Sequence, residues 1–309
     1  MGLLKRKTLM AAKIETTAYT AESLANADSS FNFYDASIKP AIEINQRMAL
    51  SNFSKRKSTA GPRSAVVTFK TDLVGNGDGA APPWADLLFP ACGFVKSTNT
   101  FGPVSSAPGA NGVKTLTIAV YEDGRKKLAK GCMGTFKFVG ESGKDMMIEW
   151  TFTGCYVQTN DASMLTPTYP TGVPLRFADA TVALGSHTPC LQKLEIDAGN
   201  NVILREDPAD SSGYKGAIVT DRTVVGTADP EAQLVAGYDT FGKWLANTEE
   251  EFSVVVDDGT DVITITAPKC EITNIDDGDR NSLRTDPITF QANLDSAGDD
   301  ELTIAFSAS

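Results

Sequence analysis

Apolar and polar residues alternate along several segments of the chain, and this two-residue period predicts β-strands with one buried face. In the first half the apolar positions are Leu116, Ile118, Val120, Phe136, Phe138, Ile148, Trp150 and Phe152. In the second half they are Phe252, Val254, Val256, Ile263, Ile265, Ile288, Phe290, Leu302, Ile304 and Phe306. Asp-Gly pairs at 123–124 and 258–259 separate strand runs, as hairpin turns do. The pattern predicts a mainly β protein.

Two segments carry a helical period instead. The first follows Pro82-Pro83 and consists of Trp84, Leu87, Leu88 and Ala91, spaced i, i+3, i+4 and i+7. The second consists of Leu234, Tyr238, Phe241 and Leu245, with Trp244 beside them. We expect each half to be a β-sandwich or barrel-like sheet assembly with one short helix packed against it.

The two halves also share landmarks. A Gly, a Thr and a Phe lie 8, 19 and 20 residues after Cys132, and again after Cys270. Upstream, successive landmarks keep nearly the same intervals: Arg47, Arg63 and Trp84 in the first half, and Arg205, Arg222 and Trp244 in the second. The interval from Trp to Cys is 48 residues in the first half and 26 in the second. We interpret the chain as two copies of one module, with coincidence as the alternative.

The excess length of the first copy falls in residues 96–114, which are rich in Ser, Asn, Gly, Thr and Pro and predict a long loop. Residues 1–29 are small and polar and predict an N-terminal arm. The expected organisation is therefore an arm at 1–29, a first module at 30–158 with its loop at 96–114, a linker at 159–173, and a second module at 174–309.

Composition narrows the classes of function. The chain has 309 residues, 28 Lys and Arg against 39 Asp and Glu, a formal net charge of −11, and one histidine. The acidic excess argues against a protein that grips nucleic acid, because such binding needs clustered cations that displace counterions from phosphates. The single His187 excludes a three-histidine zinc site and leaves one imidazole for acid–base chemistry. We expect no catalytic, cofactor or metal site.

Cysteines and targeting signals bear on the compartment. The five cysteines are odd in number and contain no CxxC pair, which favours buried, reduced thiols: Cys92, Cys132, Cys155, Cys190 and Cys270. The basic start of the chain lacks the apolar stretch of a signal peptide, and no segment approaches the roughly 18 apolar residues of a membrane span. We expect a soluble protein made in the cytosol, with no membrane partner.

Three short motifs resemble catalytic or binding motifs, but we interpret them as loops and turns. The run Gly75-Asn76-Gly77-Asp78-Gly79-Ala80 resembles a dinucleotide fingerprint, but Pro82-Pro83 would remove amides from the following helix, and we expect a flexible loop. Gly140-Glu141-Ser142-Gly143 lacks the GxSxG spacing of a nucleophile elbow and predicts a turn. Ser186-His187-Thr188-Pro189-Cys190 lacks further ligands at recognisable spacing and predicts a loop.

Charged clusters remain. The acidic runs at 257–258, 276–279 and 299–301 do not fit a twelve-residue calcium loop, so we expect solvated turns, with a bound cation as the less favoured alternative. The basic clusters are Lys55-Arg56-Lys57 and Arg125-Lys126-Lys127 with Lys130. On an acidic subunit we expect these cations to complement acidic patches of a neighbouring copy, with a solvated face as the alternative.

A duplicated β-rich module, a polar arm and the absence of a catalytic set make the chain resemble major tail tube proteins of long-tailed, siphovirus-like bacteriophages. The segments that carry the resemblance span nearly the whole chain: 12–19, Lys55-Arg56-Lys57, Gly61-Pro62-Arg63 with the strand 64–73, 84–93, Gly131-Cys132, Asp221-Arg222 before Gly226, and Ala267-Pro268-Lys269 before Cys270.

The resemblance implies a structural virion protein of the phage tail, assembled in the host cytoplasm, with no catalysis. In that family modules join sheets into rings, loops and arms bridge stacked rings, and the genome passes through the lumen without specific binding. Two modules per chain suggest trimeric rings with pseudo-sixfold symmetry, hexameric rings being the alternative. Stacked copies and the tape measure, terminator and distal tail proteins are the implied partners.

Two consequences of the resemblance can be placed on the chain. Residues 1–29 and 96–114 are expected to form the contacts between rings and to be mobile in the free subunit. The net acidity is expected to give the lumen an acidic lining that repels phosphates. The competing classes are a tail terminator or distal tail ring protein, a non-viral β-sandwich binding module and, more distantly, an enzyme.

Overall fold

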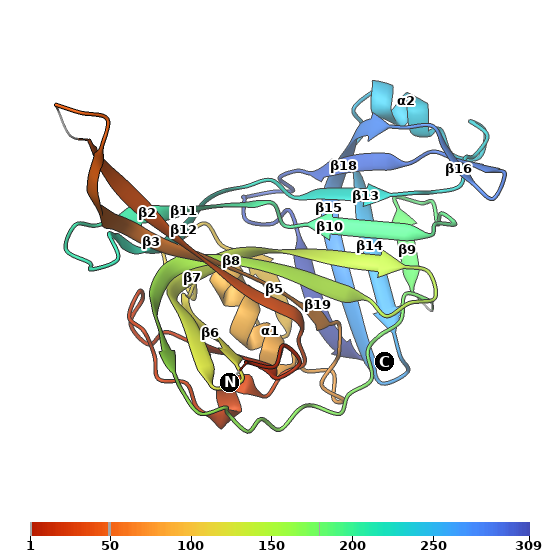
Figure 1. Ribbon diagram of the computed structural model, residues 1–309. Helices are drawn as coiled ribbons and strands as arrows, with labels where there is room; N and C mark the ends of the chain where they lie inside the picture. Colours follow the sequence, from red (N-terminus) through yellow and green to blue (C-terminus); the bar gives the residue numbers. More distant parts are fainter. Residues whose placement is uncertain (1, 49–50, 179) are drawn as a thin grey trace.

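The computed structural model describes residues 2–48, 51–178 and 180–309 and confirms a mainly β architecture (Figure 1). The strands of the first half are β1 (Thr8–Ile14), β2 (Tyr34–Met48), β3 (Lys55–Asp72), β4 (Phe94–Ser97), β5 (Thr100–Pro103), β6 (Leu116–Glu122), β7 (Arg125–Glu141) and β8 (Met147–Asp161). Those of the second half are β9 (Thr181–Leu184), β10 (Lys193–Asp197), β11 (Asn200–Glu206), β12 (Tyr214–Arg222), β13 (Val225–Ala228), β14 (Glu250–Asp257), β15 (Asp261–Ile275), β16 (Gly278–Arg280), β17 (Leu283–Thr285), β18 (Ile288–Ala292) and β19 (Thr303–Ala308).

The helical elements are short. They are α1 (Pro83–Leu88), α2 (Thr240–Leu245) and the 3₁₀ turns η1 (Asn26–Ser29) and η2 (Phe89–Cys92). The alternating apolar segments of the sequence lie in strands of this structure, or within one residue of a strand, and their apolar side chains are buried. No helix in the described part of the chain is long and apolar enough to cross a membrane.

Strands pair in the same antiparallel order in each half. The first half runs β1-β6-β7-β8-β3-β2, and the second runs β9-β14-β15-β18-β13-β10. The long hairpin β2–β3 of the first half corresponds to β10 and β11 followed by β12 and β13 in the second. Both hairpins shift register at matching places, between Ile42 and Ile44 and between Asn201 and Val202.

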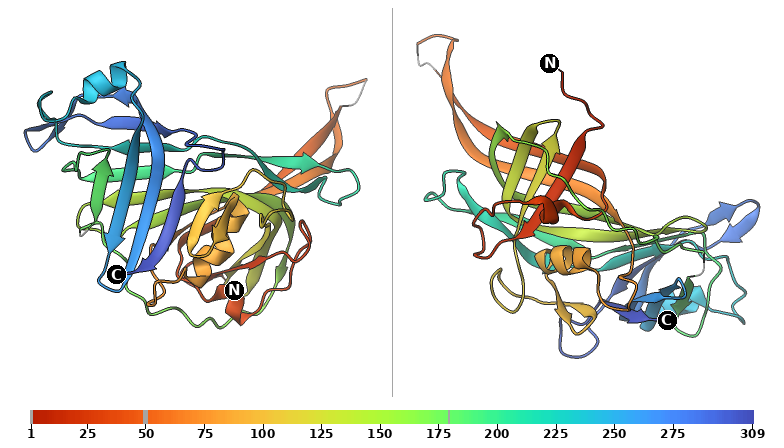
Figure 2. Two further views of the ribbon diagram at one scale, coloured as in Figure 1. Left: turned by 180° about the vertical axis from the view of Figure 1, so that it is seen from behind. Right: turned by 90° about the horizontal axis from the view of Figure 1, so that it is seen from below.

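The two halves share one sheet and one hydrophobic core. Strand β10 of the second half pairs with the end of β7, and β5 of the first half pairs with β19 of the second. Helix α1 lies between the two halves, as the view from behind shows (Figure 2). The ring of Trp84 on α1 contacts both Trp150 of β8 and Phe306 of β19, with centroid distances of 6.4 and 6.2 Å. Both apolar burial and strand pairing therefore hold the two halves together.

The prediction of an arm at 1–29 is wrong for residues 8–14, which form β1 and pair with β6. Both faces of β1 are buried: Leu9 and Ala11 pack in a small apolar cluster, and Met10 and Ala12 in the main core. A strand buried on both sides reads as a short continuous apolar run and not as an alternating one, which explains why the period gave no signal.

The loop expected at 96–114 is also only partly a loop. Residues 94–103 form the hairpin β4–β5, and Phe94 and Phe101 are fully buried in the core. β5 is held in place by β19, about two hundred residues away along the chain, so the local polar composition concealed it. The expected linker at 159–173 begins later, because β8 continues to Asp161.

The second helical stripe gives a helix of six residues that begins at Thr240, where the Asp239 carboxylate accepts the amide of Gly242. Leu234 precedes this helix, and Leu234 and Leu245 are 83% and 89% exposed. Tyr238 of the stripe is buried in the main core, so only part of the stripe packs against its own half.

Candidate assembly surfaces

The sheet that joins the two halves has one buried and one open face. On the open face lie the residues between the core positions, such as Thr68 on β3, Thr151 on β8, Thr227 on β13 and Thr289 on β18. This face continues from one half to the other, because β7 pairs with β8 on one edge and with β10 on the other (Figure 1). The result is a broad, polar and threonine-rich surface.

Lysines on the open face are paired with carboxylates on neighbouring strands. The Lys70 ammonium lies 2.6 Å from Glu149, and the Lys137 ammonium lies 3.1 Å from Glu195. The hydrogen bonds and charges of these carboxylates raise the pKa of both lysines, so the ammonium forms persist at neutral pH. These ion pairs balance part of the charge on the face.

Two of the strand edges that lack a partner among the described residues bear on assembly. Strand β10 has neighbours on both edges, β13 and β7, whereas β2, at the corresponding place in the first half, pairs only with β3. At the other end of the molecule, β16 and β17 continue the β15–β18 hairpin in the same register, from Ile275 opposite Ile288 to Gly278 opposite Thr285. The outer edge of residues 276–280 therefore has no strand beside it in the described chain.

The distal part of the β2–β3 hairpin projects away from the body of the molecule (Figures 1 and 2). Its apolar side chains are exposed: Ile42 by 45%, Ile44 by 58%, Met48 by 71% and Phe53 fully. Exposed apolar residues on an unpaired hairpin mark a contact surface or an aggregation hazard.

The corresponding hairpin of the second half, β11–β12, is instead covered. It lies across the open face of β7 and β8, where Val202 and Leu204 pack with Met133 and Ala217. The Lys130 ammonium of β7 lies 2.6 Å from the Asp210 carboxylate in the hairpin loop. The Arg63 guanidinium donates to the carbonyl of Ser211 at 2.7 Å. The second half thus clamps the first through both charge and apolar contact.

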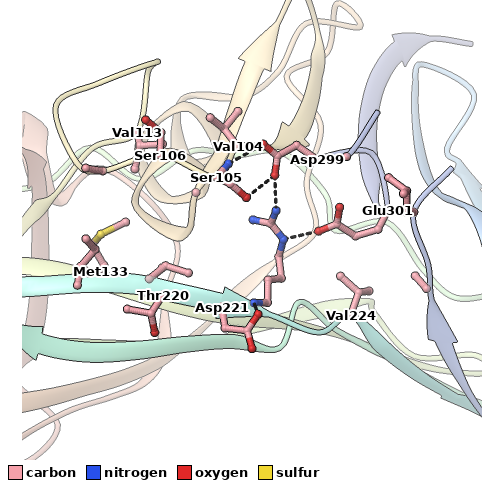
Figure 3. Close-up of a pocket in the computed structure, with 18 of the residues that line it drawn as sticks. Val104, Ser105, Ser106, Val113, Met133, Thr220, Asp221, Val224, Asp299 and Glu301 are labelled. Atoms are coloured by element: carbon pink, nitrogen blue, oxygen red, sulfur yellow. Dashed lines mark hydrogen bonds and ion pairs between the residues drawn. The ribbon is translucent and has the colours of Figure 1, made fainter. Parts of the chain in front are cut away.

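A groove of about 620 Å³ lies between this hairpin, the segment after β5 and the loop before β19 (Figure 3). Arg222 crosses it and contacts Glu301 and, at 3.0 Å, Asp299, which also accepts from Ser105. The guanidinium stacks over Phe94, 5.3 Å from the ring centroid. These contacts join segments that are distant in the sequence. Arg222, Asp299 and Glu301 are engaged in ion pairs with one another inside the groove.

The motifs singled out in the sequence have structural roles. The backbone amides of Gly77 and Gly79 donate to the carboxylate of Asp261, at 2.7 and 2.9 Å, so the glycine run grips a side chain of the second half. Gly79 has a φ of +74°, and a Cβ there would meet the backbone of Ala308 at 2.2 Å. The residues after Gly140 form the turn between β7 and β8.

His187 and Cys190 are not brought together with other ligands. The imidazole of His187 stacks on the Tyr238 ring, 4.5 Å between centroids, and Cys190 is exposed. In the described ranges no group of three or more His, Cys, Asp or Glu side chains is arranged to hold a metal ion.

The remaining four cysteines are buried and free of disulfides. Burial raises the pKa of the Cys92 and Cys132 thiols well above the usual range and that of Cys270 to about 12. Such thiols stay protonated and are poor nucleophiles.

The basic cluster at 125–130 is largely engaged within the chain. Arg125 and Lys127 both contact Glu122, and Lys130 pairs with Asp210 as described above. Two cations share one carboxylate, so the site keeps a local positive excess. The cluster at 55–57 lies on the projecting hairpin and is exposed, which leaves it available to a neighbour.

The two open strand edges described above were not predicted from the sequence. The repeat itself carried the signal, since it aligns Gly140 with Gly278 and so relates the end of β7 to the region of β16. The repeat does not show that β10 has a strand on both sides whereas β2 has one side free, because this depends on pairing between strands that are distant in the sequence.

Comparison with known proteins agrees with a structural role. A family model described as phage tail tube protein matches residues 5–308. A search of curated proteins found no matching relative. The match covers nearly the whole chain, including both halves and all strands of the shared sheet. The chain therefore belongs to the phage tail tube protein family and is a structural component of the virion tail.

Proposed function

We propose that this tail tube protein polymerises into stacked rings that enclose a conduit for DNA. The observation that carries the proposal is the strand pairing, which leaves β2 with a neighbour on one side only and leaves the outer edge of the β16–β17 ribbon, at 276–280, without a strand beside it among the described residues. A sheet with two open ends can extend by pairing with further copies, and a fixed rotation at each joint closes it into a ring.

We propose further that the two halves are copies of one module and that three chains form a ring with pseudo-sixfold symmetry. The matching strand orders and the matching register shifts of the two long hairpins support this assignment. Since each chain supplies two modules, three chains supply six positions.

The open face of the shared sheet is assigned to the lumen. It is polar, and two of its lysines, Lys70 and Lys137, are paired with Glu149 and Glu195. Affinity for a phosphate backbone comes from cations that replace condensed counterions, so paired lysines bind DNA weakly. A lining of this kind lets DNA slide.

Electron microscopy of the purified protein tests the proposal. Long hollow tubes with three chains in each ring are the expected result, and mass measurement of isolated rings gives the stoichiometry. Single closed rings that never stack would indicate a terminator or distal ring protein. Monomers at all concentrations would refute self-assembly, and six chains in a ring would refute the trimer.

A further inference from the structure

We infer that neighbouring chains join by pairing residues 37–39 of β2 with the segment 276–280 of the next copy, in the register of the β7–β10 joint but with its charges reversed. The inference rests on the proposed function, because it requires rings of this chain. It names the edges, the register and the residues that select the partner.

Strand pairing gives the correspondence between the two halves. Opposing residues form equivalent rows across three strands in each half: Ile38, Val67 and Phe152 in the first, and Ile196, Gly226 and Phe290 in the second. Residues 37–39 of β2 therefore correspond one to one to residues 195–197 of β10, and the bulge at Asp35 and Ala36 precedes this match.

The partner edge follows in the same way. Phe136 lies opposite Trp150, and Ile275 lies opposite Ile288, two residues before the aromatic of each row. Residues 137–141 of β7 therefore correspond to 276–280. Within the chain, 193–197 pair with 137–141. The unfilled counterpart of that joint is 37–39 of one chain against the segment 276–280 of another.

Charges at the two joints support this pairing. In the internal joint Asp197 lies opposite Lys137, on the open face of the sheet. At the corresponding places of the external joint lie Lys39 and Asp276, which are both exposed. The positive residue is therefore on β2, where β10 has the negative Asp197, and the negative residue is on 276–280, where β7 has the positive Lys137.

The reversal has a consequence for specificity. If β2 replaced β10 beside β7, Lys39 would lie opposite Lys137, and the displaced β10 would bring Asp197 against Asp276. Like charges placed directly across two strands destabilise the pair. The two kinds of joint therefore exclude each other, which keeps the modules alternating around the ring.

The space beside β2 also suits this occupant. A groove of about 580 Å³ lies along residues 35–38 and contains Lys5, Arg125 and Lys127 as well as Glu122. The segment expected to enter it carries Asp276, Asp277 and Asp279. Charge complementarity thus extends beyond the paired strands.

The projecting hairpin completes the match. Ile44 corresponds to Val202, which is half-buried where the β11–β12 hairpin crosses β7, whereas Ile44 is 58% exposed. In the inferred joint the β2–β3 hairpin crosses β15 and β18 of the next copy and covers Ile42 and Ile44 there.

Disulfide trapping tests the register. The double variant Lys39→Cys with Asp276→Cys, in a Cys190→Ser background, places two cysteines on directly opposed positions, where Cα atoms are about 4.5–5.5 Å apart. Mild oxidation of assembled rings should yield covalently linked trimers on a non-reducing gel. The matched control Asp197→Cys with Lys137→Cys should form an intrachain bond and run as a monomer.

Failure of this inference differs from failure of the proposed function. If the unmodified protein forms no rings, the proposed function is wrong. If the double variant forms rings or tubes but yields no intermolecular disulfide, this joint is wrong and the ring stands.

Charge exchange provides an independent test. Lys39→Glu and Asp276→Lys should each raise the critical concentration for assembly roughly tenfold, since attraction becomes repulsion at every joint. The two changes together should restore assembly. Circular dichroism of each variant confirms that the subunit is folded, and a double variant as impaired as the single ones would overturn the pairing.

Discussion

The Lys130 ammonium and the Asp210 carboxylate lie 2.6 Å apart, one on β7 of the first half and the other in the loop of a hairpin from the second. The pair lowers the pKa of Asp210 despite its partial burial. Each side chain is about one-fifth exposed, so solvent screens the pair less than a surface ion pair. It fixes where the β11–β12 hairpin lies on the first half.

Lys130→Ala should therefore destabilise the subunit by about 1–2 kcal/mol and loosen the hairpin. Urea unfolding gives the free energy, and hydrogen exchange at β11 and β12 reports the local effect. Lys126→Ala on the same strand is the matched control and should change neither. Equal exchange rates in the Lys130 variant and the parent would contradict the clamp.

Glu15 is a buried carboxylate that organises the segment after β1. It accepts hydrogen bonds from the hydroxyls of Thr115 and Thr117 and from the amides of Tyr19 and Gly131, at 2.6–2.8 Å. Glu15→Ala leaves three buried donors, the hydroxyls of Thr115 and Thr117 and the Gly131 amide, without this acceptor and should cost about 3 kcal/mol or more. Thermal unfolding of Glu15→Ala, with the exposed Glu251→Ala as control, checks this; similar losses in both would contradict it.

Tyr34 predicts a change of stability in alkali. Burial and the hydrogen bond to Asp72 raise its pKa to about 12. Because the folded pKa is above the unfolded value near 10, the stability contributed by this hydroxyl is complete below pH 10 and is lost as pH rises through 12.

The stability difference between the parent and Tyr34→Phe should therefore shrink between pH 10 and pH 12. Denaturant unfolding of both proteins at pH 8, 10 and 11.5 measures it, and the subtraction removes the titration of other groups. A constant difference across this range would show that the Tyr34 pKa is not raised.

The paired lysines of the open face predict an effect on DNA. Glu149→Gln with Glu195→Gln frees Lys70 and Lys137 and should produce salt-sensitive retention of DNA by assembled tubes. A filter-binding assay at several salt concentrations measures the effect. The same tubes with Lys70→Gln and Lys137→Gln added should lose it, whereas retention that persists would place these lysines outside the lumen.

The sequence predicted much of the fold, because most strands have one buried face. Alternation located the strands around Ile118, Phe136 and Trp150, and α1 followed from its proline start and apolar spacing. The strands that it missed take their positions from distant partners: β1 is buried on both sides, and β5 depends on β19.

The assembly surfaces were less accessible to sequence reasoning. Both Ile38 and Ile196 read as buried strand positions, and nothing local distinguishes β2, which has a free edge, from β10, which has none. The apolar stripe around Leu245 was likewise predicted to pack inward, although Leu245 is exposed. Periodicity identifies an apolar face but not the molecule that covers it.

The β7–β10 joint has a consequence for the thermodynamics of ring closure. Two modules on one chain meet at the high effective concentration that a short connection provides, so this joint forms without the loss of translational and rotational freedom that separate molecules incur. The proposed ring of three chains would bear that entropic cost for three bodies, whereas a ring of six separate modules would bear it for six. Linking modules in pairs therefore favours complete rings at lower subunit concentrations.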